Sequence, residues 1–291
     1  MASAPVTWGI WERTIGRDDL IPPALLLETV SDLGYRGIEL GPPGYLGGAL
    51  LESGFELVGG FAPLRFADPG GFEADVAEWL DPVIDVLAET GRRGPVVLAD
   101  AETPVRLAGA GRPDEQRRTA LAGDALAAAL ERVNEASERC RARDVDVVFH
   151  HHAATYVETP DEIAAFLERT DVGICFDTGH AVVGGADPLE LARLCGARIR
   201  HLHLKDVDPA LLARVRSGEL ALEQAWQLGI FCPFGEGVVD FAAVLALPEL
   251  RGFDGWVVLE QDRIAVGVDD LPAVRAVEEA NLRVVEEALA R

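Results

Sequence analysis

Residues 172–206 of the chain read VGICFDTGHAVVGGADPLELARLCGARIRHLHLKD. Two apolar runs of strand length, Val172–Asp177 and Ile199–Lys205, flank a segment with helical periodicity, Pro188–Cys195, and the N-cap signal Asp187-Pro188 begins that segment. A strand, a helix and a second strand in this order are typical of a βαβ unit with parallel strands. Because both strands are almost continuously apolar, we expect a sheet that is covered on both faces.

The same alternation extends in both directions from this unit. Further strands are expected at Val6–Gly9, Gly37–Leu40, Leu57–Phe61, Pro95–Ala99, Val145–His150 and Gly255–Glu260. Further helices are expected at Pro23–Leu33, Phe72–Glu89, Asp114–Arg143, Pro160–Arg169, Asp240–Leu245 and Leu271–Ala290. Strands and helices in this number favour a (β/α)₈ TIM barrel, and we expect a single barrel domain over residues 1–291. An open doubly wound sheet is the alternative, but no G-x-G-x-x-G follows the first strand.

The longest predicted helix, Asp114–Arg143, has apolar residues at helical spacing. These should pack one face of the helix against the barrel, and they are Leu121, Ala125, Ala128, Ala129 and Val133. The face that carries Arg117, Arg118 and Glu131 should be solvated. We therefore expect no catalytic role for this segment.

The charge and the apolar content of the chain indicate which kinds of binding partner to expect. The chain has 26 Lys and Arg against 49 Asp and Glu, a net charge of −23, and 49% of its residues are hydrophobic. Such a chain can bury a large core, and a surface this acidic repels nucleic-acid phosphates. No apolar run approaches the roughly 20 residues of a membrane span. We therefore expect neither nucleic acid nor membrane as a partner, and a homo-oligomer stays open.

The cysteines and the N-terminus indicate the compartment. Four cysteines are scattered without a C-x-x-C pair, which is typical of reduced thiols. The first residues contain no basic segment followed by an apolar stretch, so no signal peptide is expected. Both observations predict a cytoplasmic protein.

All six histidines lie between positions 150 and 203, at three predicted strand ends. They occur in the segments His150-His151-His152, Asp177-Thr178-Gly179-His180 and His201-Leu202-His203-Leu204-Lys205. Two further carboxylates, Glu39 and Glu260, stand at the ends of other predicted strands. Since the carboxyl ends of barrel strands converge on one face, we expect these groups to meet at one mouth of the barrel.

Imidazole and carboxylate groups in this arrangement indicate a divalent-metal site. Such ligands suit Zn, Mn, Co or Fe, and the absence of thiolate pairs argues against a structural zinc site. Side chains alternate along a strand, so His150 and His152 share one side, as do His201 and His203. Aromatic residues near strand or loop ends would, as a set, form the apolar walls of a small-molecule pocket: Trp8, Trp11, Tyr45, Phe231 and Phe234.

Six stretches of the sequence, in register along nearly the whole chain, carry a family resemblance. They are GIELGP at 37–42 with GYL at 44–46, FHHHAAT at 149–155, FDTGH at 176–180, HLHLKDV at 201–207, FCPFGEG at 231–237 and WVVLEQD at 256–262. With these motifs the chain resembles the xylose-isomerase-like barrel superfamily of sugar isomerases and epimerases. Within that superfamily it is most similar to the inosose (2-keto-myo-inositol) dehydratases.

The resemblance implies a set of metal ligands. The superfamily usually takes Glu, Asp, His and Glu from four strand ends, and Asp177, His203 and Glu260 match the last three. At the first position this chain has His150 where the isomerases and epimerases have Glu. The dehydratase branch also has H-x-H there, which leaves either His150 or His152 as the direct ligand. We take His150 as the ligand, with His152 lining the pocket.

The resemblance also implies an activity, a metal-dependent lyase that removes water from a keto-cyclitol or a related ketose through an enediolate. One of Lys205, His152 or Glu39 would remove the proton, and His180 would assist departure of the hydroxyl group. The alternatives on the same scaffold are a sugar isomerase or epimerase, or a deglycosidase acting on 3-oxo C-glycosides. A non-catalytic sugar-binding protein with a decayed site is a further alternative, although the set of ligands is intact.

Overall fold

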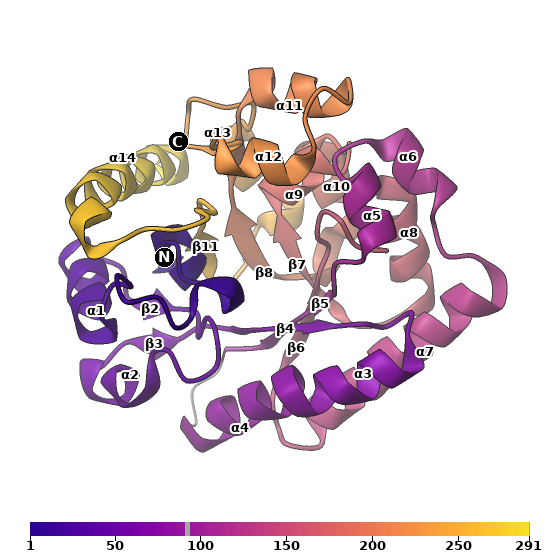
Figure 1. Ribbon diagram of the computed structural model, residues 1–291, viewed down its shortest axis with the longest axis horizontal. Coiled ribbons are helices and arrows are strands. Elements are labelled where there is room, and N and C mark those ends of the chain that lie inside the picture. The colour runs from indigo at the N-terminus through magenta and orange to yellow at the C-terminus, as the bar shows by residue number, and fades with distance from the viewer. Residues whose placement is uncertain (91–93, 291) are drawn as a thin grey trace.

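The computed structural model of the chain describes residues 1–90 and 94–290. Residues 91–93 and 291, which the expected domain range 1–291 includes, lie outside the described residues. The strands form a curled parallel sheet, and helices surround its outer face (Figure 1). Within the described ranges, no helix is both long and apolar enough to cross a membrane.

The parallel sheet has the strand order β3-β2-β1-β11-β8-β7-β6-β5-β4. Its strands are β1 (Ala2–Ser3), β2 (Gly37–Ile38), β3 (Glu56–Leu57), β4 (Gly60–Leu64), β5 (Val96–Asp100), β6 (Val147–His150), β7 (Gly173–Asp177), β8 (Ile199–Leu204) and β11 (Val257–Leu259). The two outermost strands in this order, β3 and β4, are separated in the chain by Val58 and Gly59 alone. The Val58 N–H donates to Ile38 and the Gly60 N–H to Pro95, so this one segment pairs with β2 on one side and β5 on the other. The sheet is therefore closed, and the predicted (β/α)₈ TIM barrel is confirmed.

The helices connect and cover the strands. They are α1 (Pro23–Asp32), α2 (Gly47–Ser53), α3 (Pro69–Asp75), α4 (Asp81–Thr90), α5 (Pro104–Gly109), α6 (Pro113–Arg118), α7 (Gly123–Arg141), α8 (Pro160–Arg169), α9 (Thr178–Val183), α10 (Pro188–Cys195), α11 (Pro209–Arg216), α12 (Leu222–Gln227), α13 (Phe241–Leu245) and α14 (Leu271–Leu289). Many begin with proline after an Asp or Thr cap; the Asp187 carboxylate, for example, accepts from the N–H groups of Leu189 and Glu190. The main core contains side chains of strands and helices, such as Phe176 and Leu191, so it lies between the two layers.

The stretch that follows β8, residues 206–232, contains two strands and two helices that were not expected from the sequence. Strands β9 (Asp206–Val207) and β10 (Phe231–Cys232) pair antiparallel. Helices α11 and α12, both orange in Figure 1, lie between these strands in the chain. The Asp206 carboxylate accepts from the N–H groups of Gly235, Gly237 and Val239 and so holds the return of this excursion. The excursion adds a wall above the carboxyl ends of the strands.

The first predicted strand, Val6–Gly9, is wrong. The strand is Ala2–Ser3, which pairs with β2 and β11, and Pro5–Trp8 forms a 3₁₀ turn. Proline has no N–H to donate to a neighbouring strand and suits the first position of a helical turn. Gly9, with φ of 69°, ends the turn and donates to the Val6 carbonyl.

The single helix predicted at Asp114–Arg143 is also wrong, because it is divided into α6 and α7. The fully buried Arg106 of α5 donates from Nη1 to the Gln116 carbonyl (2.7 Å) and to Thr119 Oγ1 (3.1 Å). These bonds occupy groups at the C-terminus of α6, and the helix ends there.

The predicted faces of this region are correct in part. Ala129 and Val133 are buried, together with Leu130, but Ala125 is exposed because it lies in the first turn of α7. Arg117, Arg118 and Glu131 are exposed, as expected. The buried face of α7 therefore begins about one turn later than the sequence pattern indicated.

Candidate metal centre and active site

Four strand ends bring imidazole and carboxylate groups together in the barrel. His150 ends β6, Asp177 ends β7, His203 lies near the end of β8, and Glu260 follows β11 directly. One donor atom of each of Asp177, His203 and Glu260 lies within 4.8 Å of the others. His150 Nε2 is 3.7 Å from Asp177 Oδ2. This separation is far below the roughly 10 Å at which groups with ligand bonds of about 2.0–2.2 Å could not share one ion.

The atoms that face this centre fit a divalent cation. The buried His203 Nδ1 lies 3.7 Å from Asp177 Oδ2 and 3.1 Å from Glu260 Oε2, so three possible ligand atoms converge on one point. His150 Nδ1 lies 2.6 Å from the His151 carbonyl, so it carries the proton and leaves the Nε2 lone pair free. His151 itself is turned away and accepts the Asp177 N–H at Nε2. Side chains whose second polar atom is held by the protein are typical of metal ligands.

Glu39 lies behind His203. Its Oε1 is 3.1 Å from His203 Nε2 and 2.9 Å from His201 Nε2. Although burial favours the neutral acid, the charge and hydrogen bonds of His203 and His201 lower the pKa of Glu39 to about 2. Glu39 is therefore a buried carboxylate that turns His203 Nδ1 toward the centre.

Lys205 follows β8 directly, two residues after His203. Its Nζ is 3.3 Å from Asp177, 3.0 Å from Glu260 and 2.9 Å from Asp262. Burial would lower the pKa of Lys205, but these three carboxylates raise it well above its ordinary value. Lys205 is thus an ammonium ion, which donates hydrogen bonds and can stabilise negative charge.

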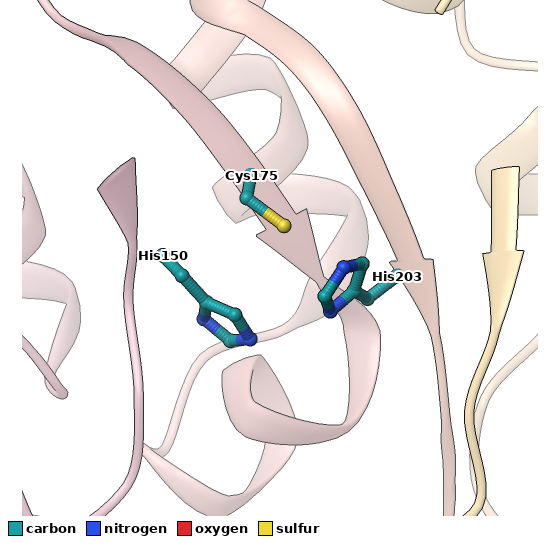
Figure 2. A group of neighbouring side chains, drawn as sticks. All are labelled: His150, Cys175 and His203. Carbon is teal, nitrogen blue, oxygen red and sulfur yellow. The ribbon is translucent and has the colours of Figure 1, made fainter. Parts of the chain in front are cut away.

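Figure 2 shows Cys175 of β7 between the rings of His150 and His203. These three residues also lie within 4.8 Å of one another. Burial raises the pKa of the Cys175 thiol to about 12, so the sulfur stays protonated and is a poor ligand compared with Asp177. It packs instead with Val97 and Val148. The sequence motifs did not single out Cys175, although its position two residues before Asp177 puts both side chains on one side of β7.

The last two histidines, His152 and His180, lie side by side, and His180 contacts Lys205. His152 lines the cavity, and its Nδ1 lies 2.8 Å from the Ala153 carbonyl, which leaves Nε2 as an acceptor. Burial, followed by the charge of Lys205, lowers the pKa of His152 to about 4. The His180 ring lies 3.9 Å from that of His152, and His180 Nε2 is 3.1 Å from Lys205 Nζ. His180 is not among the residues that line the cavity, and it contacts the site through Lys205.

The cavity at this mouth has a volume of about 360 Å³. His150, His152, His203, Lys205 and Glu260 form its floor, and Trp11, Phe61, Trp79 and Trp226 line its walls. Of the aromatic residues that the sequence suggested as walls, Trp11 is the one found there. Trp8, Phe231 and Phe234 are buried in the core, and the Tyr45 hydroxyl donates to the Ile21 carbonyl.

Sequence reasoning missed several residues of this cavity. Asp262 contacts Lys205, and burial raises the pKa of Asp262 to about 6 against the lowering effect of the Lys205 charge. The segment Glu260-Gln261-Asp262 could have indicated this residue, because side chains two positions apart in an extended segment lie on the same side. Trp226, by contrast, lies on α12, for which the sequence had indicated no helix.

The barrel and the imidazole and carboxylate groups at its carboxyl mouth define a protein of the (β/α)₈ enzyme class. The pattern of the family described as xylose isomerase-like TIM barrel matches residues 27–282, and the chain belongs to this family.

Relatives in sequence support this assignment. The inosose dehydratase of Geobacillus kaustophilus is 30% identical over 274 residues, which cover 89% of this chain and 86% of that protein. The rhizopine catabolism protein MocC of Rhizobium meliloti is 32% identical over 274 residues, which cover 90% and 81%.

Solved structures share the fold at lower identity. The probable 3-DHS dehydratase AsbF involved in petrobactin synthesis from Bacillus anthracis has a TM-score of 0.68 at 15% identity, with 98% of both chains covered. A xylose isomerase-like TIM barrel protein from Mycobacterium smegmatis, in complex with magnesium, has a TM-score of 0.62 at 20% identity, with 99% of this chain and 97% of that chain covered.

Proposed function

We propose that this protein is a divalent-metal-dependent dehydratase that acts on a keto-cyclitol such as 2-keto-myo-inositol. The main support is the 30% identity, over most of both chains, to a protein named inosose dehydratase. The buried donor atoms of Asp177, His203 and Glu260, which all lie within 4.8 Å of one another, favour a metal-dependent reaction at this mouth.

The proposed ligands are His150 through Nε2, Asp177, His203 through Nδ1, and Glu260. These imidazole and carboxylate donors suit Mn, Co, Zn or Fe. When bound, such an ion supplies a Lewis acid that polarises a substrate carbonyl and lowers the barrier to loss of the neighbouring proton.

The side chains at the floor can complete an elimination. His152, neutral and with Nε2 free, would accept the proton from the carbon next to the carbonyl. Lys205, which lines the cavity, would donate a proton to the hydroxyl group that leaves from the next carbon. One C–H bond and one C–O bond break, a C=C bond forms, and water departs. Proton return from His152 to Lys205 through solvent restores both groups.

Glu39 and His180 are the other two acid or base groups that the sequence indicates. Since Glu39 contacts His201 and His203, and His180 contacts Lys205, we propose that both act as positioning residues. Each would orient a neighbouring side chain that faces the cavity.

The test is to incubate the purified protein with 2-keto-myo-inositol and Mn²⁺ or Co²⁺. We expect an ultraviolet-absorbing dione, with nearly one divalent ion retained per chain, and no such product would contradict the proposal. Repeating the reaction in deuterium oxide separates the alternatives, because an isomerase or epimerase would introduce solvent deuterium without loss of water. Cleavage of a 3-oxo C-glycoside under the same conditions would indicate the deglycosidase instead.

A further inference from the structure

Arg65 lies in the cavity wall, where hydrogen bonds to Asp75 and Gly71 fix its guanidinium group. It follows β4 directly, at the carboxyl end of that strand, and it lines the cavity. Its Nε donates to Asp75 Oδ2 (2.8 Å), and its Nη2 donates to Asp75 Oδ1 (2.6 Å) and to the Gly71 carbonyl (3.4 Å). The Asp75 side chain is 6% exposed, whereas that of Arg65 is 44% exposed. A buried carboxylate thus holds a guanidinium group whose other side stays accessible.

The hydrogen-bond inventory of Arg65 leaves two donors free. A guanidinium group has five N–H donors, one on Nε and two on each terminal nitrogen. The three bonds to Asp75 and Gly71 use those of Nε and Nη2. No partner within the described chain is found for Nη1. Paired donors on one planar nitrogen, fixed by a bidentate carboxylate, are suited to recognise an oxygen of a bound molecule.

The backbone around Asp75 is also specialised. A Cβ atom at Gly71 would lie 2.8 Å from Arg65 Nε and 2.6 Å from Asp68 Oδ2, so a larger residue here would displace the Arg65 side chain, the Asp68 side chain or both. Directly after Asp75 the chain forms a π-helical turn, Val76–Leu80, and Trp79 of that turn lines the cavity. Because π-helical turns are frequent at functional sites, this local geometry indicates more than a surface ion pair.

The charges of the cavity indicate what kind of oxygen Arg65 meets. Its acidic lining residues are Glu12, Glu39, Asp75, Asp100, Glu102, Glu260 and Asp262, and its basic ones are Arg13, Arg65 and Lys205. Asp75 neutralises Arg65, and three carboxylates surround Lys205. A carboxylate or phosphate on the ligand would therefore face excess negative charge, whereas a hydroxyl oxygen would not.

We propose that Arg65 is a specificity-determining residue that donates from Nη1 to an uncharged hydroxyl oxygen of the substrate, away from the metal centre. Asp75 and Gly71 position its guanidinium group. The choice of substrate rests on the proposed function, but the donor itself rests on the geometry of Arg65.

The test compares Arg65→Met with Arg139→Met in the metal-loaded protein. Arg139 is a matched control because it also forms a two-bond pair with an aspartate, Asp81, at 2.5 and 2.6 Å, yet does not line the cavity. For Arg65→Met we expect the KM for 2-keto-myo-inositol to rise about 10- to 100-fold, the range for loss of a charged hydrogen-bond donor, with kcat and metal content nearly unchanged. Arg139→Met should behave as wild type.

Two further variants keep the proposal testable if Arg65→Met folds poorly. Arg65→Lys retains the charge but loses the planar fork, and Gly71→Ala crowds the guanidinium group without changing a charge. Both should raise KM and leave metal content unchanged. A KM for these variants equal to that of Arg139→Met would overturn the proposal.

Calorimetric titration with 2-keto-myo-inositol separates this inference from the proposed function. If wild type binds the ketone without dehydrating it, the proposed function fails, and a 10-fold or greater loss of affinity in Arg65→Met still supports the role of Arg65. If wild type does not bind the ketone, both proposals fail.

Discussion

At the scale of single residues, the candidate centre depends on which atom of each side chain is left free. The His151 carbonyl holds His150 Nδ1, and Glu39 holds His203 Nε2, so the opposite nitrogen of each ring faces the centre. Asp177 likewise uses Oδ1 to accept the His180 N–H, and its Oδ2 lies 3.7 Å from both His150 Nε2 and His203 Nδ1. These outer contacts determine the directions in which the ligands point.

His150→Glu and Asp177→Ala should separate metal binding from catalysis. Two imidazoles and two carboxylates neutralise a divalent ion less than a set with three carboxylates, and a less neutralised ion acidifies a substrate more strongly. We therefore expect His150→Glu to retain metal but to lose most dehydration, whereas Asp177→Ala loses the metal. Metal content and rate, measured together, test both. Full activity in His150→Glu would show that the imidazole at this strand end is incidental.

Glu39→Gln should weaken metal binding about 10- to 100-fold, the usual effect of removing a partner behind a histidine ligand. The amide keeps the shape of Glu39 but loses the charge that orients His203. Titration of the metal-free protein with Co²⁺ measures this affinity. Glu102→Gln is a suitable control, because Glu102 also lines the cavity but contacts Arg13 instead of a histidine. Equal affinities in the two variants would argue against a positioning role for Glu39.

At the scale of elements, β8 and α5 each supply side chains that connect several other segments of the chain. Strand β8 presents His201 and His203 to Glu39, and Lys205 follows directly after it. Helix α5 contributes Arg106, which joins the end of α6 to the loop after β6 by donating to the Thr155 carbonyl (2.6 Å). His201 and His203 lie on one side of β8 because side chains alternate along a strand. Arg106 can bind the end of α6 because the last carbonyl groups of a helix have no partner within that helix.

Arg118→Glu on α6 should leave turnover within a few-fold of wild type. Arg118 is exposed and pairs with Glu115 of the same helix, and exposed pairs of this kind contribute about 0–1 kcal/mol. Steady-state kinetics checks this expectation. A large loss of kcat would mean that α6 contributes to the site.

Arg106→Met should lower the free energy of unfolding by about 3–5 kcal/mol, the usual cost of leaving a buried charge without its partner. Arg106 is fully buried and lies 2.8 Å from Glu162. Denaturant titration measures the loss, with Arg118→Met as the exposed control. A loss below about 1 kcal/mol, the range of exposed pairs, would contradict this account.

At the scale of the whole molecule, buried carboxyl groups outside the candidate metal ligands make stability depend on pH. Burial raises the pKa of Glu158 to about 7, although the N–H groups of Gly111 and Ala154 lower it in part. The unfolded chain, with a carboxyl pKa near 4.5, loses this proton at a lower pH than the folded protein. The folded state therefore binds more protons between about pH 4.5 and 7, and this carboxyl destabilises the protein progressively as pH rises through that window.

Glu158→Gln should remove this part of the pH dependence. The change in unfolding free energy between pH 5 and pH 8 should differ from that of wild type by up to about 3 kcal/mol, since one pKa unit corresponds to about 1.4 kcal/mol. Denaturant titrations of both proteins at each pH measure the difference, and the comparison cancels the other titrating groups. Asp161→Asn, at an exposed carboxyl of α8, should match wild type. Parallel pH profiles for Glu158→Gln and wild type would contradict the prediction.

The fold was predictable where long periodic segments alternate, as in β7, α10 and β8. It was not predictable where elements are short. Strand β1 has two residues and is defined by its pairing with β2 and β11, because a run of that length carries no periodicity of its own. Helix α12 has six residues and was not predicted, for the same reason.

By itself, the sequence determined the alternation of strands and helices and the types of residue at the strand ends, because both depend on neighbours in the chain. His150, Asp177, His203 and Glu260 could be identified in this way. Only the tertiary structure decided which atoms face the centre, since Glu39 contacts His203 across 164 positions of the chain. The same holds for the cavity wall, where Arg65 from the end of β4 and Trp226 from α12 line one space. Contacts between distant segments arise from closure of the barrel, and no local pattern of residues encodes them.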